Sequence, residues 1–315
     1  MVSIGDDAAV TEVDRGSLQV LTTDSLVEGV HFDRRFSSAA DIGYKALAVN
    51  VSDIAAMGAA PRLALLSLIL PQHTDVETID GIIDGLLEVA IATGVVVAGG
   101  NITRSPGPLI VDVTVTGAVK PRRILTRSGG RPGDRLYVTG SIGAAVAGLE
   151  WLTEHARNAD HTGDRLTPED SDMAQCVARH RRPEPRARVG WLLGRTRAAT
   201  ACMDLSDGLA DAVRQIAEAS STGARLDATA LPIHPGAARW FTSRGRDPVE
   251  ASLSGGDDYE LLCAASPRTR GRLRLVDRQA RGVPLTLIGE LTADRALTVT
   301  RGNSSNPLPA GFVHF

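Results

Sequence analysis

Five short motifs in the chain place carboxylates beside small residues. They read GDDAA, TTD, NVSD, DLSDG and GGDDYE, at residues 5–9, 22–24, 50–53, 204–208 and 255–260. Small neighbours let the backbone approach a ligand, and carboxylate oxygens are ligands that hard cations such as Mg²⁺ prefer. Because protein-bound Mg²⁺ usually accompanies phosphate groups, the motifs predict a site for magnesium-bound polyphosphate.

Some of these carboxylates also have an ordinary structural explanation. The pair at 6–7 could lie in a solvated glycine turn, and the pair at 23–24 could simply end an apolar strand. Asp53 is different, because it interrupts an apolar helical pattern, one turn after Asn50. An unpaired buried charge is very costly, so this carboxylate needs a metal ion or an arginine as its partner.

The later motifs indicate where phosphate groups could approach. Residues 204–208 follow an apolar run and begin a predicted helix at 207–220, whose N-terminus would favour anions. Ser206 or Asp207 could instead cap that helix. The paired glycines at 99–100 close a short apolar strand and offer a second point of approach.

Several common catalytic signatures are absent from the sequence. It contains no G-x-x-x-x-G-K-[ST], no G-x-G-x-x-G after a strand, and no G-x-S-x-G. The histidines show no metal-binding spacing, although His31 could contact a substrate phosphate or cap a loop. The chemistry is therefore expected to come from carboxylates and the cations they hold.

Composition narrows the class of protein. The chain has 315 residues, 43% hydrophobic and 23% charged, as expected for a soluble globular protein of one large or two ordinary domains. A net charge of −3 and an aromatic share of 3% argue against nucleic-acid binding. The three cysteines are far apart and no signal or membrane-spanning segment is evident, so we expect a cytoplasmic protein with no membrane partner.

The elements that must position the motifs fall into two α/β or α+β units. Turn-forming residues at 127–134 separate them, which predicts domains at 1–128 and 129–315. In the first domain we expect strands at 18–22, 62–70, 95–98 and 109–119, and helices at 38–58 and 74–93. In the second we expect strands at 135–139, 259–264, 285–288 and 297–300, helices at 143–152, 185–193 and 207–220, and a polar loop at 154–172.

In their order and number, the motifs resemble those of thiamine-monophosphate kinases, in the superfamily of aminoimidazole-ribonucleotide synthetase. The resemblance spans almost the whole chain, and EGVHF at 28–32 and GFVHF at 311–315 favour this family over its relatives. It implies two domains of mixed sheets flanked by helices, the first binding ATP and magnesium and forming a homodimer. It also implies direct in-line phosphorylation of thiamine monophosphate to thiamine diphosphate by ATP, assisted by several Mg²⁺ ions, with no dedicated catalytic base.

The resemblance also implies a role for each residue at a position that matches the family's motifs. The residues expected to bind magnesium are Asp6, Thr22, Thr23, Asp24, Asp53, Asn101, Asp204 and Asp207. Those expected to contact ATP are Gly100, Asn101, Arg127 and Ser206. Those expected to contact thiamine monophosphate are His31, Asp257 and Phe312.

Two departures from the family pattern leave alternatives open. Asn101 stands where the family usually has aspartate, which predicts a weaker first metal site or a different ion preference. Only four residues precede GDDAA, so either the native start lies upstream of Met1 or the usual N-terminal helical segment is missing. The alternatives are another ATP-dependent enzyme of the superfamily, or a non-catalytic protein that binds nucleotide and metal. The cysteine positions do not suit a selenophosphate synthetase or a hydrogenase-maturation enzyme.

Overall fold

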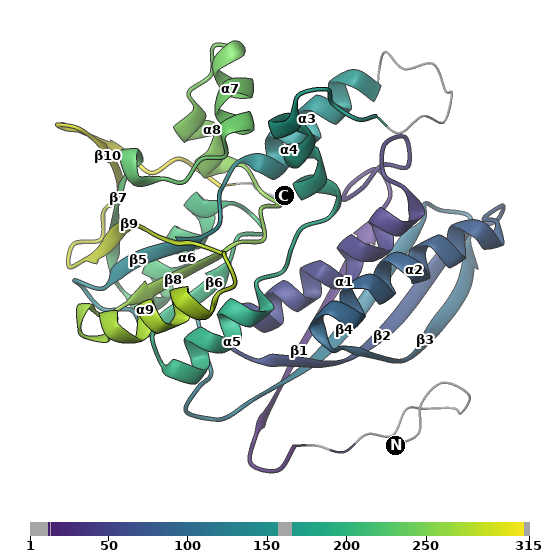
Figure 1. The fold of residues 1–315 in the computed structure, drawn as a ribbon, viewed down its shortest axis with the longest axis horizontal. Helices are drawn as coiled ribbons and strands as arrows, with labels where there is room; N and C mark the ends of the chain where they lie inside the picture. The colour runs from purple at the N-terminus through teal and green to yellow at the C-terminus, as the bar shows by residue number, and fades with distance from the viewer. Residues whose placement is uncertain (1–11, 13, 157–165, 312–315) are drawn as a thin grey trace.

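The chain forms two units, each built on one mixed β-sheet (Figure 1). The computed structural model describes residues 12, 14–156 and 166–311. The first sheet has the strand order β1-β4-β2-β3, and the second has the order β11-β10-β7-β9-β5-β8-β6. The pairs β2–β3 and β10–β7 are parallel and the other neighbours are antiparallel. The predicted class, mixed sheets flanked by helices, is confirmed.

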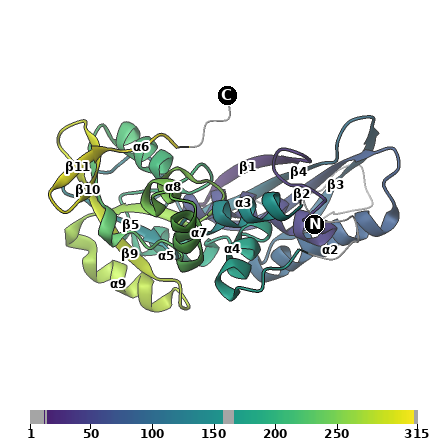
Figure 2. The ribbon, with the colours of Figure 1, turned by 90° about the horizontal axis from the view of Figure 1, so that it is seen from above.

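The first unit carries its helices on one face of its sheet (Figures 1 and 2). Its elements are β1 (Leu18–Val27), α1 (Ala39–Ala56), β2 (Ala60–Pro71), α2 (Val76–Thr93), β3 (Val96–Ser105) and β4 (Ile110–Val119). Alternate residues of β4, such as Val111 and Val113, are fully buried under the helices. The opposite face is open, and there Leu21 and Leu65 are 65% and 44% exposed.

Helix α1 is the central element of the molecule. Its start is fixed by a reciprocal cap, in which Ser38 Oγ accepts from Asp41 N at 3.2 Å and the Asp41 carboxylate accepts from Ser38 N at 3.1 Å. Its sides contact α2, β1, β4, α5 and β6, so it touches both units. Polar side chains on this helix are therefore held at the junction of the two sheets.

The second unit surrounds its seven-stranded sheet with helices (Figure 1). Its strands are β5 (Arg135–Thr139), β6 (Ala201–Asp204), β7 (Gly223–Asp227), β8 (Leu261–Ala265), β9 (Leu285–Thr292), β10 (Leu297–Arg301) and β11 (Ser304–Pro307). Its α-helices are α3 (Ala144–Ala156), α4 (Ser171–Arg181), α5 (Ala187–Thr196), α6 (Leu209–Ser220), α7 (Pro235–Ser243), α8 (Pro248–Ser254) and α9 (Arg270–Gln279). No helix in the described part of the chain is long and apolar enough to span a bilayer.

Several expected boundaries were wrong. TTD at 22–24 and the glycines at 99–100 lie within β1 and β3, rather than at strand ends, because cross-strand pairing extends both strands through polar residues. Helix α6 begins at Leu209 with Gly208 as its N-cap residue and no side-chain cap, so neither Ser206 nor Asp207 caps it. Helix α4 begins inside the expected polar loop at 154–172, of which residues 157–165 lie outside the described residues.

A buried ion pair holds the last acidic motif to the rest of the second unit. Glu260 is 1% exposed, and its carboxylate accepts from Arg186 Nε at 2.6 Å and Arg186 Nη2 at 2.5 Å. Thr139 Oγ1 donates to the same carboxylate at 2.6 Å. These bonds join the residues before β8 to the start of α5 and the end of β5, so this carboxylate has a structural role.

Replacing Glu260 by glutamine should lower the free energy of unfolding by about 3–5 kcal/mol, since it leaves the Arg186 charge buried without its main counterion. Glu154→Gln is the matched control, because the Glu154–Arg244 pair is largely exposed and should contribute below about 1 kcal/mol. Urea unfolding of both variants measures the difference. Equal losses in the two variants would contradict a special role for the buried pair.

Candidate functional site

A cavity of about 410 Å³ lies between the two units, and residues of both line it. From the first unit come the end of β1, the segment that follows it, and α1. From the second come α3, α4 and the two acidic motifs around 206 and 257. Five residues predicted to act at the site line this one cavity: Asp24, His31, Ser206, Asp207 and Asp257.

The acidic motifs of the second unit are joined through their backbones. Asp257 N donates to Ser206 O at 2.8 Å, and Tyr259 N donates to Leu205 O at 3.0 Å. A Cβ on Gly256 would lie 2.6 Å from Ser206 O, so this close approach requires glycine. The two motifs, about fifty residues apart in sequence, therefore form a single wall of the cavity.

The backbone of this wall adopts an uncommon conformation. Asp257 and Tyr259 have φ values of 68° and 48°, in the left-handed region that non-glycine residues seldom occupy. Such positions persist where surrounding contacts fix them, and they cluster at functional sites. Here the hydrogen bonds to Ser206 and Leu205 fix the loop and direct Asp257 into the cavity.

Three carboxylates from distant parts of the chain meet beside the cavity. Asp24 lies on β1, Asp53 on α1 and Asp204 at the end of β6. Thr22 Oγ1 donates to Asp53 Oδ2 at 2.5 Å, and Ser52 Oγ donates to Asp204 Oδ2 at 2.7 Å. The second of these bonds links the two units, since Ser52 belongs to α1 and Asp204 to the seven-stranded sheet.

Burial, and for Asp24 and Asp204 the charge of neighbouring carboxylates, disfavours the ionised form of these groups. Burial, followed by the charge of Asp53, raises the pKa of Asp24 to about 6. Burial, followed by the charges of Asp53 and Asp24, raises the pKa of Asp204 to about 7. Burial also raises the pKa of Asp53, although the hydrogen bond from Thr22 and the charge of Arg127 oppose the shift. A cation in this position would relieve the repulsion.

The donor chemistry of this group fits Mg²⁺, but the described residues do not form a complete cage. In residues 12, 14–156 and 166–311, no group of three or more His, Cys, Asp or Glu side chains is arranged to hold a metal ion. Magnesium in proteins typically keeps water molecules and is held by one or two carboxylates together with phosphate oxygens. An incomplete set of carboxylates beside a cavity is compatible with that mode of binding.

Arginine, the other expected partner of Asp53, plays a smaller part. Arg127 lowers the pKa of both Asp53 and Asp204 through its charge. Its own side chain is exposed and donates to Gln215 Oε1 on α6. The direct hydrogen-bond partners of Asp53 are therefore Thr22 and Asp24.

A buried lysine that the sequence analysis missed supports the two predicted substrate contacts. Lys45 on α1 is 4% exposed, and its Nζ donates to Asp257 Oδ2 at 2.8 Å and to His31 O at 3.2 Å. His180 Nδ1 lies 3.6 Å from the same Asp257 oxygen. Lys45 is one of only two lysines in the chain and stands in an apolar helical pattern, a signal that could have identified it.

This arrangement keeps Asp257 ionised. Burial alone would raise its pKa, but the charge of Lys45 and the neighbouring His180 outweigh that effect and hold the pKa well below its usual range. Burial and the charge of Lys45 lower the pKa of His180, which favours its neutral form. The cavity thus presents a fixed negative charge, one third exposed, at its wall.

The neighbouring carboxylate has a different role. Asp258 is 5% exposed and accepts from Gly143 N at 2.7 Å and Ala145 N at 3.2 Å, at the start of α3. Burial raises its pKa to about 7, against the effect of these two hydrogen bonds. Asp258 therefore fixes the end of a helix that lines the cavity.

Other predicted residues lie apart from the cavity. Thr23 points to the open face of the sheet, opposite Thr22 and Asp24, because alternate strand residues face opposite sides. Gly100 and Asn101 lie on β3, the far edge strand, with β4 and β2 between them and β1. Gly100 packs tightly against β2, since a Cβ at this position would lie 1.8 Å from Leu66 O. Asp6 and Phe312 lie outside the described residues.

A further carboxylate, also missed from the sequence, shares a row of the sheet with Asn101. The register aligns Ser25, Asp112, Ser67 and Asn101 across the four strands. Ser25 Oγ donates to Asp112 Oδ2, and the charge of Asp112 contributes to the raised pKa of Asp24. Asp112 therefore supplies negative charge on the same side of the sheet as the neutral Asn101.

Comparison with known proteins identifies the family. The model of the AIR synthase related protein, N-terminal domain, matches residues 5–119, and that of the C-terminal domain matches residues 131–302. Curated thiamine-monophosphate kinases of Rhodopirellula baltica, Bacillus subtilis and Escherichia coli K12 are 34%, 36% and 39% identical. These matches cover 99%, 100% and 93% of this chain and 91%, 93% and 85% of the relatives.

Solved structures agree with these matches. Thiamine-monophosphate kinase from Stenotrophomonas maltophilia is 34% identical, with a TM-score of 0.85 over 95% of this chain and 90% of that one. The structure described as AaThiL complexed with AMPPCP and TMP is 29% identical, with a TM-score of 0.81 over 99% and 92% of the two chains. The resemblance inferred from the motifs is confirmed, and the chain belongs to the thiamine-monophosphate kinase family of AIR synthase related proteins.

Proposed function

We propose that this chain transfers the γ-phosphoryl group of ATP to the phosphate of thiamine monophosphate, giving thiamine diphosphate and ADP. The observation that carries the proposal is the single cavity that collects Asp24, His31, Ser206, Asp207 and Asp257 beside the coupled carboxylates. Membership of the family supports it, since one related structure is described as a complex with AMPPCP and TMP.

The acceptor substrate would occupy the cavity. Its thiazolium ring is cationic, and the ionised Asp257 supplies a fixed negative charge there. Apolar side chains such as Val30 and Leu149 also line the cavity and suit the rings of the substrate. His31 and Asp257 are held in one arrangement by Lys45, so the binding surface is ordered in advance.

Magnesium would be held at the junction by Asp24, Asp53 and Asp204, with Thr22 and Asp207 as further ligands. Thr23 and Asn101, which face the other side of the sheet, and the N-terminal Asp6 would serve a separate magnesium ion. Bound Mg²⁺ would neutralise the phosphate groups and the charge that develops during transfer. The raised pKa values of Asp24 and Asp204 support this assignment, because they show that the ionised carboxylates are disfavoured where they stand. A bound cation would stabilise the ionised forms.

No general base is required for the transfer. The attacking atom is a phosphate oxygen that is already anionic, so the main barrier is bringing two anions together in line. The residues of the chain position the two substrates and hold the cations. The reaction is therefore expected to proceed by direct transfer, without a phosphorylated protein intermediate.

ATP would extend along the sheet. Gly100 lies in the same register row as Asp24, across three strand spacings, or about 14 Å. A ligand must therefore be extended if it is to contact both β3, at Gly100 and Asn101, and the region of Arg127 and Ser206. Arg127 lies near enough to the carboxylates to lower their pKa, which suits a contact with phosphate.

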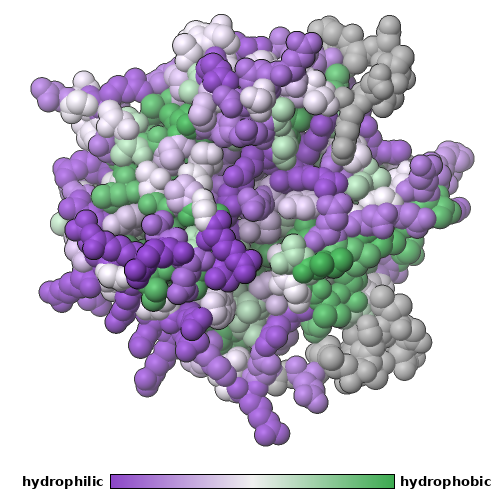
Figure 3. Space-filling model, in the orientation of Figure 1, coloured by the Kyte–Doolittle hydropathy of each residue, from purple (hydrophilic) through white to green (hydrophobic). Residues whose placement is uncertain are grey.

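A homodimer is the proposed assembly, formed through the open face of the four-stranded sheet. That face exposes Leu21 and Leu65, and β1 and β3 are edge strands within the described sheet. A separate apolar area, on the helical side of the first unit, is seen in Figure 3, where α2 exposes Leu87 and Ile91. We place the enzyme in the cytoplasm, since Cys176, Cys202 and Cys263 are free and buried.

The purified protein should form thiamine diphosphate from ATP, Mg²⁺ and thiamine monophosphate, and Asp53→Ala should lower kcat by about 10³-fold or more by removing a central ligand. Asp80→Asn, an exposed change on α2, should keep full activity. Chromatographic assay of thiamine diphosphate gives the result. ATP binding without product would favour the non-catalytic alternative, and turnover of ATP with another acceptor would favour a different enzyme of the superfamily.

Without Mg²⁺, stability should fall as the pH rises from about 4 to about 7. Asp24 and Asp204 have folded pKa values of about 6 and 7 against 3.8 unperturbed, so the native state binds more protons in this window. Thermal unfolding at several pH values measures the slope, and Mg²⁺ should raise Tm chiefly at the upper end.

Asp204→Asn should weaken the dependence of Tm on pH and reduce the increase in Tm that Mg²⁺ produces. The contribution of Asp258, which titrates in the same range, should remain. A magnesium effect that is equal at pH 5 and pH 8, or unchanged in Asp204→Asn, would argue against a cation at this junction.

Asn101→Asp should lower the Mg²⁺ concentration needed for half-maximal rate by up to about tenfold, because it adds a charged ligand. Asp112→Asn should raise that concentration, since Asp112 supplies charge in the same row. Rates measured over a magnesium titration at saturating substrates decide the question. An unchanged magnesium requirement in both variants would remove positions 101 and 112 from the metal site.

Lys45→Met should raise KM for thiamine monophosphate by about tenfold or more while KM for ATP changes little, because Asp257 loses the cation that fixes and ionises it. Lys120→Met, at the other lysine, is the matched control and should not alter either KM. A loss confined to kcat would show that Lys45 acts in the transfer step instead of in substrate binding.

A further inference from the structure

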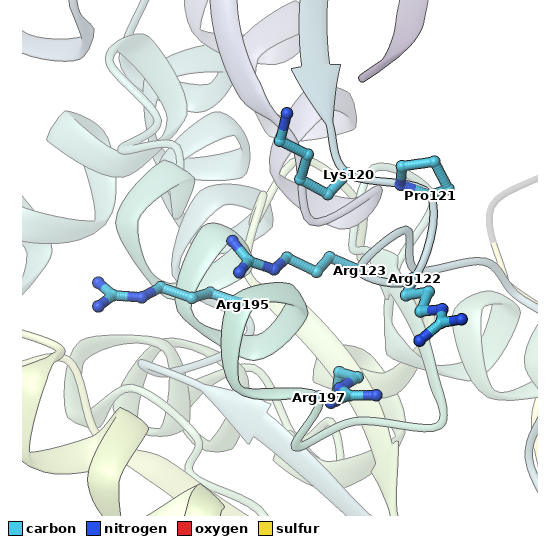
Figure 4. A pocket seen from close by; sticks show the side chains of 6 residues that line it. All are labelled: Lys120, Pro121, Arg122, Arg123, Arg195 and Arg197. Carbon is cyan, nitrogen blue, oxygen red and sulfur yellow. The ribbon is translucent and has the colours of Figure 1, made fainter. Parts of the chain in front are cut away.

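A second cavity, of about 540 Å³, is lined almost entirely by cations. It lies where the segment after β4 meets the end of α5, and its lining residues are Lys120, Pro121, Arg122, Arg123, Arg195 and Arg197 (Figure 4). No carboxylate lines it, although the chain as a whole has a net charge of −3. It shares no lining residue with the candidate active site.

The arginines of this cavity are not used by the rest of the described structure. Elsewhere many arginines pair with carboxylates, as Arg135 does with Glu290. Within residues 12, 14–156 and 166–311, the guanidinium groups of the cavity have no such ion pair; Arg195 instead lies over the Trp191 ring, 4.8 Å from its centroid. Their N–H donors therefore remain available to a ligand.

The backbone that carries these cations is firmly held. Arg123 N donates to Lys120 O at 2.8 Å, and Leu125 N donates to Met57 O at 3.0 Å. Arg123 O packs against α5 so closely that a Cβ on Gly194 would lie 2.6 Å from it. The cavity is thus built on two segments in fixed contact, at the connection between the two units.

Figure 4 shows how the side chains are arranged around the last turn of α5. Arg123 and Arg195 extend in the same direction on one side, and Arg122 and Arg197 lie on the other side. The negative end of the α5 dipole accounts for cations at 195 and 197. It does not account for three more cations brought to the same place from another segment.

We propose that this cavity binds a small polyphosphate anion, such as a nucleoside polyphosphate or inorganic tripolyphosphate, apart from the catalytic cavity. Five cationic side chains line this one cavity without a carboxylate among them, and guanidinium groups bind phosphate oxygens in pairs. The volume is that of a small-molecule site. The chain's net negative charge and 3% aromatic content disfavour nucleic acid as the ligand.

Calorimetric titration with tripolyphosphate in EDTA tests the proposal without relying on catalysis. The wild-type chain should bind tripolyphosphate more tightly than orthophosphate, and affinity should fall between 50 and 200 mM salt, about the range over which phosphate contacts are screened. The double variant Arg123→Gln/Arg195→Gln should bind about tenfold or more weakly, as the loss of charge-assisted hydrogen bonds requires.

The matched control is Arg274→Gln/Arg278→Gln on the exposed face of α9, which changes net charge equally and should alter affinity less than about twofold. Equal losses in the two double variants would overturn the proposal in favour of general electrostatic attraction. Unchanged binding in the first variant would place the anion elsewhere. Binding of single-stranded RNA but not tripolyphosphate at this cavity would also overturn it. A parallel titration with ATP shows whether the cavity binds a nucleotide or inorganic polyphosphate more tightly.

Discussion

The structure depends on the burial of three neighbouring carboxylates at the junction of its two sheets. Asp24, Asp53 and Asp204 come from a strand of the first unit, the central helix and a strand of the second unit, and each has a raised pKa. The fold offsets the cost of this burial with hydroxyl donors and with the charge of Arg127. In the proposed function a cation would neutralise these charges more completely, so the same burial would favour magnesium and its phosphate partners.

Helix α1 connects this constraint to the rest of the molecule. It places Lys45 under the predicted substrate contacts, and Ser52 and Asp53 among the carboxylates two turns further along. The second unit contributes two acidic motifs whose backbones are hydrogen-bonded to each other. The helix and this wall thus fix the position of the cavity relative to the carboxylates.

Much of the first unit could be predicted from the sequence, because its helices are apolar on the faces that pack and capped by polar residues. The strand ends could not, since β1 and β3 continue through polar residues only because neighbouring strands pair with them. The motifs predicted the residues of the cavity, but not their separation: Thr23 and Asn101 face another side of the sheet from Asp24. Lys45, His180 and Asp112 were missed because their roles arise from contacts across the fold.

The most direct test is to locate the cation itself. Crystals grown with Mn²⁺ in place of Mg²⁺, together with ATP or a non-hydrolysable analogue, should show anomalous density at the junction. We predict at least one peak within coordination distance, about 2.0–2.3 Å, of oxygens from Asp53 and from Asp24 or Asp204, shared with phosphate oxygens. Density only at other positions, with these three carboxylates unliganded, would contradict the account.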